Sequence, residues 1–154
     1  MQLSQVADLD NVDLKILRDL QHDARVSFKT IAQKIGVSEA TIFVRVKKMQ
    51  ERRVIKGFTT LVSPAAVGKP LTAIVLVRAN PQEYTGTLDA LRKFDDIYEI
   101  YDVTGQYYSI LKIRTSGTEE LGKIMDDIGR IDGIAGTETI IVLRTVKEDI
   151  TVRI

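Results

Sequence analysis

The residues best suited to a defined chemistry lie between Arg45 and Lys56, where six side chains are basic and only Glu51 is acidic. Lysine and arginine at this density neutralise nucleic-acid phosphates, and an α-helix fits the major groove of DNA. We therefore predict a DNA-reading helix. Its candidate DNA-binding residues are Ser38, Glu39, Thr41, Phe43, Val44, Arg45, Lys47, Lys48 and Arg52. The alternative is a basic, solvated face in a plain helical bundle.

Two short amphipathic segments must position that surface. Apolar side chains recur at helical spacing in residues 27–35, and Ile42, Val46 and Met49 do the same in residues 39–51. Between them, Gly36 can take the positive φ that ends a helix, and Ser38 is a good N-cap for the next helix. Two helices joined by so tight a turn predict a helix-turn-helix arrangement.

A further helix and a β-prone segment flank this pair. Asp10 can cap a helix that begins near residue 11, with Asp13 close to the positive end of the helix dipole. Because the first helix carries several acids that would repel DNA, we expect it to lie away from the nucleic acid. Residues 54–62 favour β-structure and can form a wing or a strand.

No residue pattern indicates catalysis or a bound metal. The 154-residue chain has no cysteine and one histidine, His22, which excludes disulfides, thiolate sites and a histidine cluster within one chain. The sequence contains neither a G-x-x-x-x-G-K-[ST] loop nor a G-x-G-x-x-G loop for binding phosphates. We therefore expect no enzyme activity, no catalytic residue, no metal and no cofactor.

The composition is that of a soluble globular protein, with 44% hydrophobic and 28% charged residues. No apolar run approaches the roughly 20 residues that a membrane span needs. The first residues lack the basic and apolar regions of a secretion signal. These features predict a cytoplasmic protein with no membrane partner.

Charge divides the chain into two parts. Residues 1–62 hold 11 Lys/Arg and 7 Asp/Glu, a net charge of +4. Residues 63–154 hold 11 Lys/Arg and 14 Asp/Glu, a net charge of −3, so the whole chain carries +1. A basic first part and an acidic second part indicate two modules with separate tasks.

The second module repeats an order of elements. Residues 63–70 contain two prolines and Gly68, which favours an irregular hinge. Residues 71–79, 97–104, 107–115 and 137–146 then favour strands, with helical patterns after residues 80 and 116. The order βαββαβ predicts a ferredoxin-like domain. The predicted fold is α+β, with a helix-turn-helix domain over 1–62, a hinge over 63–70 and a βαββαβ domain over 71–154.

A family resemblance follows from the run D-L-K-I-L-R-D-L-Q-H-D-A-R-V-S-F-K-T-I-A-Q-K-I-G-V-S-E-A-T-I-F-V-R-V-K-K-M. It resembles the N-terminal domain of the Lrp/AsnC transcriptional regulators, and the βαββαβ order is similar to the family's ligand-responsive C-terminal domain. The resemblance implies double-stranded DNA as a partner and self-assembly into dimers and octamers. It also implies a small amino-acid-like effector bound between dimers. Arg53 is a departure, because the family usually has glycine there.

The resemblance also implies an effector site around the turn at residues 103–109. Its candidate residues are Tyr101, Thr104, Gly105, Gln106, Tyr107, Tyr108, Thr137 and Thr139. Similar regulators often read V-T-G-x-x-D-Y, whereas this chain has Tyr108 in place of the aspartate and Ser109 in place of the tyrosine. A carboxylate there would pair with an effector's ammonium group.

Loss of that carboxylate leaves three outcomes: another polar group substitutes, the effector differs, or no effector binds. Glu138 could replace the charge only if its side chain points into the pocket. Strand alternation places Glu138 opposite Thr137 and Thr139. The alternative explanation for all these residues is ordinary polarity at a sheet edge.

Two functions of different class follow from these patterns. The first is a sequence-specific transcription regulator whose DNA affinity changes with an amino-acid-like effector. The second is an architectural DNA-organising protein whose C-terminal domain only oligomerises. Effector-dependent DNA affinity would distinguish them.

Overall fold

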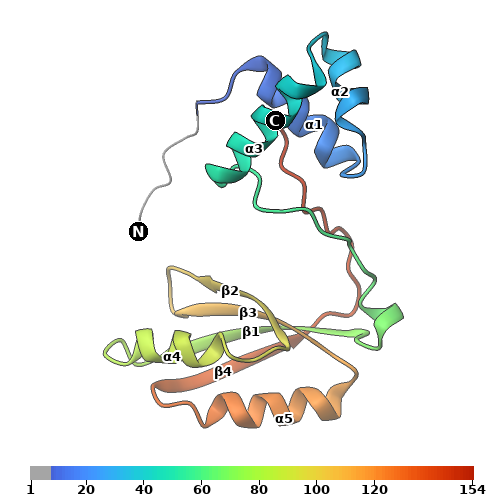
Figure 1. Cartoon of the computed structure of the whole chain (residues 1–154). Coiled ribbons are helices and arrows are strands. Elements are labelled where there is room, and N and C mark those ends of the chain that lie inside the picture. Colours follow the sequence, from blue (N-terminus) through green and yellow to red (C-terminus); the bar gives the residue numbers. More distant parts are fainter. Residues whose placement is uncertain (1–7) are drawn as a thin grey trace. The chain divides into compact units, whose positions relative to one another are not determined.

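The computed structural model describes residues 8–154, and the chain forms two compact units (Figure 1). The helical unit extends to Thr60 and also includes Glu148–Ile154, whereas the sheet unit comprises Leu61–Lys147. The predicted domain over 71–154 thus differs from the structure in its last residues, which group with the helices. Residues 1–7, the start of the predicted first domain and the part examined for a secretion signal, lie outside the described residues.

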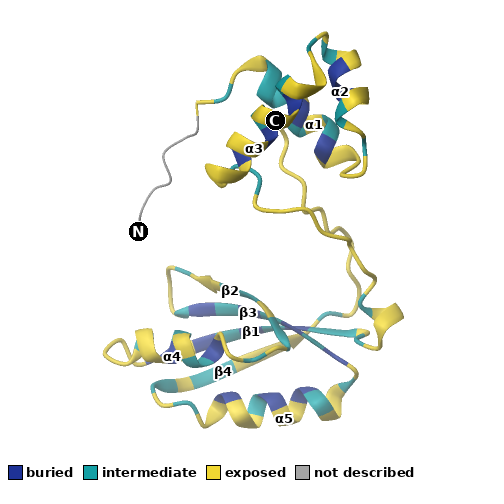
Figure 2. Ribbon diagram, in the orientation of Figure 1, coloured by how far each residue is buried: buried dark blue, intermediate teal, exposed yellow. Residues whose placement is uncertain are grey.

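The helical unit contains α1 (Asn11–His22), α2 (Phe28–Ile35) and α3 (Glu39–Glu51). Buried positions recur along each helix at the helical periodicity of the sequence (Figure 2), and their side chains form one core. That core consists of Ile16, Leu20, Ile31, Ala32, Ile42, Val46 and Met49. The predicted helix-turn-helix is confirmed: α2 and α3 are joined by a short turn and pack with α1.

Side chains and one glycine define the helix ends as predicted. Asp10 caps α1, accepting bonds from the backbone N–H groups of Val12 and Asp13, and the Asp13 carboxylate accepts from the Asp10 N–H. Ser38 caps α3 by accepting from the N–H of Thr41 at 3.0 Å. Gly36, with φ of 84°, ends α2 in the left-handed conformation.

Arg53 takes the left-handed conformation in which glycine is usual, with φ of 56°. The Arg53 N–H donates to the Gln50 carbonyl at 2.9 Å, and the Val54 N–H donates to the Met49 carbonyl at 2.8 Å. These two bonds satisfy carbonyls at the end of α3 in a Schellman arrangement. The helix therefore ends as it would with glycine, at a cost in backbone strain.

Replacing Arg53 with glycine is expected to stabilise the helical unit by about 0.5–1 kcal/mol, because glycine adopts this φ without a Cβ clash. Urea unfolding, followed through amide exchange of the α3 core residues, measures the change. Arg53→Ala is the control, since it removes the same charge but keeps the Cβ atom. Equal stability of the two variants would contradict the strain explanation.

The β-prone residues 54–62, expected to form a wing or strand, have no regular secondary structure. A strand needs a partner for its backbone groups, and no strand of the described residues pairs with this segment. The hinge after it contains a short 3₁₀ helix at Ala65–Val67, which Gly68 ends with φ of 83°.

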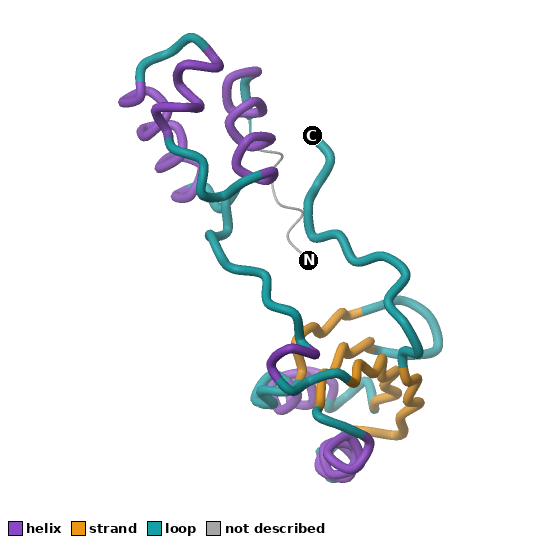
Figure 3. Tube along the Cα trace, turned by 90° about the vertical axis from the view of Figure 1, so that its right-hand side faces the viewer, coloured by secondary structure: helices purple, strands orange, loops and turns teal. Residues whose placement is uncertain are grey.

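The sheet unit contains β1 (Leu71–Ala79), α4 (Tyr84–Leu91), β2 (Ile97–Asp102), β3 (Ser109–Thr115), α5 (Thr118–Gly129) and β4 (Ile134–Ile141). The strand order is β2-β3-β1-β4, and each neighbouring pair is antiparallel. This confirms the ferredoxin-like prediction. Figure 3 shows the sheet with its two helices, and loop from the end of β4 onward.

The last strand begins and ends earlier than the predicted 137–146. Its extent follows the partner strand, because Ala79 pairs with Ile134 and Ala73 pairs with Ile141. The backbone N–H of Val142 still donates to the Thr72 carbonyl at 2.9 Å. Near this point β1 begins, so residues 143–146 have no strand beside them despite their β-branched character.

The sheet has one covered face and one open face. Ala73, Val75 and Val77 of β1 point toward α4 and α5 and are fully buried, together with Leu111 and Ile113 of β3. The alternate residues form the open face. Apolar side chains of that face are Ile74, Leu76, Tyr101, Ile110 and Ile140.

Candidate DNA-reading surface and effector region

The exposed ridge of α3 is the candidate DNA-reading surface. Ile42, Val46 and Met49 face the core, which leaves Glu39, Phe43, Val44, Lys47 and Lys48 exposed to solvent. Phe43 and Val44 are 57% and 48% exposed. The Phe43 ring meets the Phe28 ring edge to face, at a centroid distance of 6.5 Å. Apolar side chains at such positions can contact thymine methyl groups.

Two predicted DNA contacts, Ser38 and Thr41, also have a structural task. The Ser38 hydroxyl accepts from the Thr41 N–H and lies 2.7 Å from the Thr41 hydroxyl. Both residues therefore fix the first turn of α3, the end that enters the groove in helix-turn-helix proteins. The cap occupies the Thr41 N–H, and the Ser38 carbonyl accepts from the Ile42 N–H at 3.2 Å, so the two hydroxyl groups are what these residues can offer to a partner at that end.

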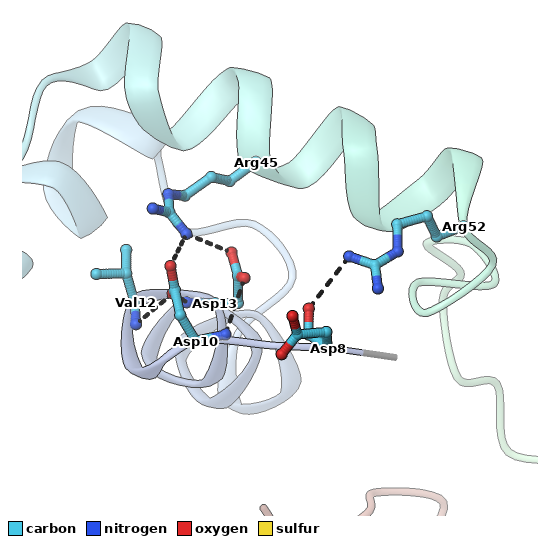
Figure 4. Close-up of polar contacts among 6 residues, drawn as sticks. All are labelled: Asp8, Asp10, Val12, Asp13, Arg45 and Arg52. Carbon is cyan, nitrogen blue, oxygen red and sulfur yellow. Dashed lines mark hydrogen bonds and ion pairs between the residues drawn. The ribbon is translucent and has the colours of Figure 1, made fainter. Parts of the chain in front are cut away.

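Arg45 does not extend into solvent but binds the N-terminal end of α1 (Figure 4). Its Nη1 atom lies 2.6 Å from Asp10 Oδ2 and 2.9 Å from Asp13 Oδ1. Asp13 is the more buried partner, with a side chain 14% exposed. Arg45 thus links the reading helix to the two residues that cap α1, a role that the sequence analysis did not foresee.

These contacts set the protonation of both partners. The Asp13 backbone N–H and the Arg45 guanidinium hold the pKa of Asp10 below its usual value. In turn, hydrogen bonds to Asp10 and Asp13 raise the pKa of Arg45 above its usual value. The exposed Asp10 carboxylate is therefore ionised in the native cap.

The helical unit is expected to lose stability in acid through Asp10. A carboxyl whose pKa is lower in the folded state contributes stability above its unfolded pKa, near 4, and loses it as pH falls through the folded pKa. Asp10→Asn keeps a good N-cap but no titrating group, so its stability should depend less on pH in this range.

Amide exchange of Ile16 and Ile42 in the whole protein, followed from pH 6 to pH 3, measures this dependence. Asp8→Asn is the control, because Asp8 contacts Arg52 through its backbone carbonyl and not its carboxylate. An acid response in Asp10→Asn as steep as in the wild type would refute the assignment.

Arg52 and the two lysines differ in their surroundings. The Arg52 Nη1 donates to the Asp8 carbonyl at 3.2 Å (Figure 4). Among residues 8–154, Lys47 and Lys48 have no carboxylate partner.

A shallow groove between α1 and α3 brings several of these side chains together. Its lining residues are Asp13, Ala40, Thr41, Val44, Arg45, Lys48, Met49 and Arg52.

The predicted effector residues lie around the turn between β2 and β3 and on β4, but they do not converge within one chain. Thr104, Gly105 and Gln106 form an exposed turn in which Gly105 has φ of 117°. Tyr101 lies on the open face and donates to Glu99 at 2.7 Å. Thr137 and Thr139 lie on the opposite face, because they pair with Val77 and Val75.

Glu138 points to the open face, as strand alternation predicted. It pairs with Leu76 and accepts a hydrogen bond from the Tyr107 hydroxyl. The Arg78 guanidinium lies 5.8 Å from the centroid of the same tyrosine ring. Glu138 is therefore engaged by Tyr107, on the face away from the two threonines.

Tyr108 turns the other way and packs on Tyr84 of α4, with ring centroids 5.0 Å apart. The Tyr84 hydroxyl lies 2.8 Å from the Tyr108 carbonyl oxygen and 3.0 Å from Asp102 Oδ1. Burial and the neighbouring Asp102 raise the pKa of Tyr84 to about 12, so its hydroxyl stays protonated and donates.

Tyr84 and Asp102 were missed by the sequence analysis. Asp102 directly precedes the turn motif and is a carboxylate within the region that lacks the expected aspartate. Tyr84 lies in the first turn of α4, some twenty residues away in sequence, and only the fold brings it to Tyr108. No local pattern signals that contact.

No helix within residues 8–154 is long and apolar enough to cross a membrane. No three potential metal-ligating side chains cluster there.

Comparisons with known proteins agree with this geometry. The AsnC-type helix-turn-helix domain matches residues 9–50, and the Lrp/AsnC ligand binding domain matches residues 72–152. The HTH-type transcriptional regulator FL11 of Pyrococcus horikoshii is 41% identical over 140 residues, covering 91% of this chain and 93% of the relative.

Solved structures have the same fold. The structure of E. coli AsnC matches with a TM-score of 0.87 and 32% identity, covering 93% of this chain and 97% of that one. A transcriptional regulator from Neisseria meningitidis, solved as a complex with L-Met, matches with a TM-score of 0.87 and 20% identity. The match covers 94% of this chain and 96% of the Neisseria chain. At 20% identity it shows that the two proteins share a fold.

Both modules and the relatives are those of DNA-binding regulators and not of enzymes. The chain belongs to the Lrp/AsnC family of transcription regulators.

Proposed function

We propose that α3 reads double-stranded DNA through its exposed ridge, with Lys47 and Lys48 on phosphates and Phe43 and Val44 against base edges. One observation carries this proposal: the helical core is complete without these side chains, so a basic and apolar ridge stays free for a partner. Ser38, Glu39 and Thr41 mark the end that enters the groove. Arg45, bound to the N-terminal end of α1, and Arg52, bound to the Asp8 carbonyl before it, hold the ridge in place and border the contact.

Lys48→Ala is expected to weaken DNA binding and to lower the slope of log affinity against log salt concentration by about one. The reason is that one lysine–phosphate contact releases about one counterion. Fluorescence anisotropy at several salt concentrations measures the slope. Lys123→Ala, which removes the same charge from an exposed site on α5, is the control. An unchanged slope in Lys48→Ala, with the fold intact, would exclude this contact.

We infer a symmetric dimer formed through the open face of the sheet. A sheet with one apolar face uncovered needs a second layer, and sheets pack well face to face. The open face combines Ile74, Leu76 and Ile110 with charged side chains, namely Lys112 beside Ile74 and, nearer the border, Arg78 and Glu99. A dimer also carries two reading helices, which matches pseudo-palindromic operators with half-sites about 34 Å apart. Further assembly to octamers is part of the same proposal.

In this proposal the effector is a small amino-acid-like molecule that binds between dimers. The protein acts in the cytoplasm. The separation of the candidate residues onto two faces supports a site that needs more than one chain. The relative solved with L-Met supports an amino acid as the ligand class. Tyr108 packs on Tyr84 and offers no carboxylate, so the ordinary partner for the ammonium group is lost.

That loss also favours the second candidate, an architectural DNA-organising protein without an effector. One experiment separates the two. Operators are first selected from random DNA, and the affinity for the selected operator is then measured alone and with each of the twenty amino acids. A several-fold change with at least one amino acid supports the regulated form. An affinity that none of them changes supports the architectural form.

A further inference from the structure

Residues 148–154 follow the sheet unit in sequence but group with the helices, where they contact α1. The chain therefore reaches the helical unit twice, once through the segment after α3 and once through its last described residues. The predicted βαββαβ domain extends over 71–154, but none of its predicted helices and strands reaches residues 148–154.

Gln21 holds the segment by its backbone. The Gln21 side-chain Nε2 donates to the Val152 carbonyl at 3.0 Å, and its Oε1 accepts from the Val152 N–H at 2.7 Å. A side-chain amide that bonds both backbone groups of one residue replaces the pairing that a neighbouring strand would provide. The Gln21 side chain thus makes the same two hydrogen bonds to Val152 that a residue of a neighbouring β-strand would make.

Arg18 continues this contact one helical turn away. Its Nε donates to the Ile154 carbonyl at 2.7 Å. Residues three apart on a helix are neighbours on one face, and residues two apart on an extended chain point to the same side. Arg18 and Gln21 therefore match Ile154 and Val152 in spacing, with the segment running antiparallel to α1.

The segment is also ordered before it reaches Gln21. Thr151 donates to Asp149 Oδ1 twice, from its backbone N–H at 2.9 Å and from its hydroxyl at 2.7 Å. This turn presents the backbone of Val152. The apolar side chains add little, because Ile150 and Val152 remain 64% and 67% exposed. Recognition rests on backbone groups.

We propose that residues 148–154 are a strap that docks on the Arg18–Gln21 surface of α1 and restrains the DNA reader. Three hydrogen bonds between exposed groups are weak as an intermolecular contact, but covalent attachment to β4 supplies a high effective concentration. A reader held by the strap as well as by the hinge samples fewer orientations. Less orientational freedom is then lost when a dimer places two readers on DNA.

The docking is tested first without DNA, by amide exchange of Val152 in the whole protein. In Gln21→Ala the Val152 N–H loses its acceptor, and its protection is expected to fall about tenfold. Lys15→Ala, an exposed residue of the same helix, is the control and should leave protection unchanged. Protection of the Ile16 and Ile42 amides shows that the helical core is intact. A Val152 amide as unprotected in the wild type as in Gln21→Ala would overturn the docking.

The restraint is tested by DNA affinity in Gln21→Ala and in a variant that lacks residues 148–154. Both are expected to bind the selected operator about 3–10-fold more weakly at an unchanged salt slope, because no phosphate contact is lost. Unchanged affinity, higher affinity or a reduced salt slope would overturn the restraint. Failure of DNA reading itself appears instead as a wild-type protein with no operator preference, so the two failures are distinct.

Discussion

Leu76→Lys is expected to convert the protein to a monomer and to lower its operator affinity about 100-fold or more. Leu76 lies on β1, in the middle of the open face, between Ile110 of β3 and Glu138 of β4. In a face-to-face dimer two such lysines would be desolvated in the middle of the interface, and the cost of burying these charges exceeds the gain from pairing with Glu138 and removes the contacts of two leucines. The monomer tolerates the change, because the new ammonium group can pair across the strands with Glu138.

Light scattering at micromolar concentration gives the mass, and anisotropy gives the affinity for the selected operator. Thr85→Lys adds the same charge at an exposed position of α4 and should change neither quantity. Affinity falls because, in the monomer, binding of one reading helix no longer raises the effective concentration of a second reading helix at the other half-site. If Leu76→Lys keeps the mass of the wild type, the proposed dimer face is wrong.

Gly133→Ala is expected to destabilise the sheet unit by roughly 2–5 kcal/mol, combining backbone strain with crowding. Gly133 has φ of 87°, and an added Cβ would lie 2.7 Å from both Glu83 Cβ and Thr87 Oγ1. The surroundings cannot easily shift, since Thr87 is buried and its hydroxyl lies 3.0 Å from the Asp132 carbonyl oxygen. The Gly133 carbonyl also accepts from the Asn80 N–H at 2.7 Å.

The matched control is Gly68→Ala in the same unit. Gly68 has nearly the same φ, 83°, but nothing lies within 4 Å of an added Cβ. Gly68→Ala should therefore lower the stability of the sheet unit through backbone strain alone, by about 1 kcal/mol. Urea dependence of amide exchange at Val75 and Leu111 measures both variants. Similar losses at the two glycines would show that the packing of α4 against the start of β4 tolerates an extra methyl group.

Local signals in the sequence account for much of the fold. Asp10, Ser38 and Gly36 act within one helical turn, so their side chains or conformational freedom reveal the helix ends without knowledge of the rest. Arg53 is the informative exception. The sequence alone left the end of α3 open, and the structure shows that two backbone hydrogen bonds hold the residue in the conformation that glycine would take more easily.

Features that depend on distant partners could not be predicted in this way. The bounds of β4 follow β1, some sixty residues earlier, and the contact of Arg45 with Asp13 joins residues on separate helices. Tyr107 and Tyr108 are adjacent in sequence, yet one contacts Glu138 and the other contacts Tyr84. The sequence therefore identifies the region of the candidate effector site. It does not show which of these side chains point into the same pocket.

The discontinuous helical unit has a consequence for the order of events during synthesis. Every buried residue of its core lies between Ile16 and Met49, so the reader can fold as soon as α3 has left the ribosome. Residues 148–154 are made about a hundred residues after the end of α3, a delay on the order of 10 s at typical elongation rates. The nascent chain thus carries a folded reader while the sheet is incomplete, and the strap can dock only after the sheet strands have been synthesised. Cleavage in the exposed residues 143–147 would remove the strap but leave β4 and the reading helix intact, so the cleaved chain would keep only the hinge as the covalent connection between its two units.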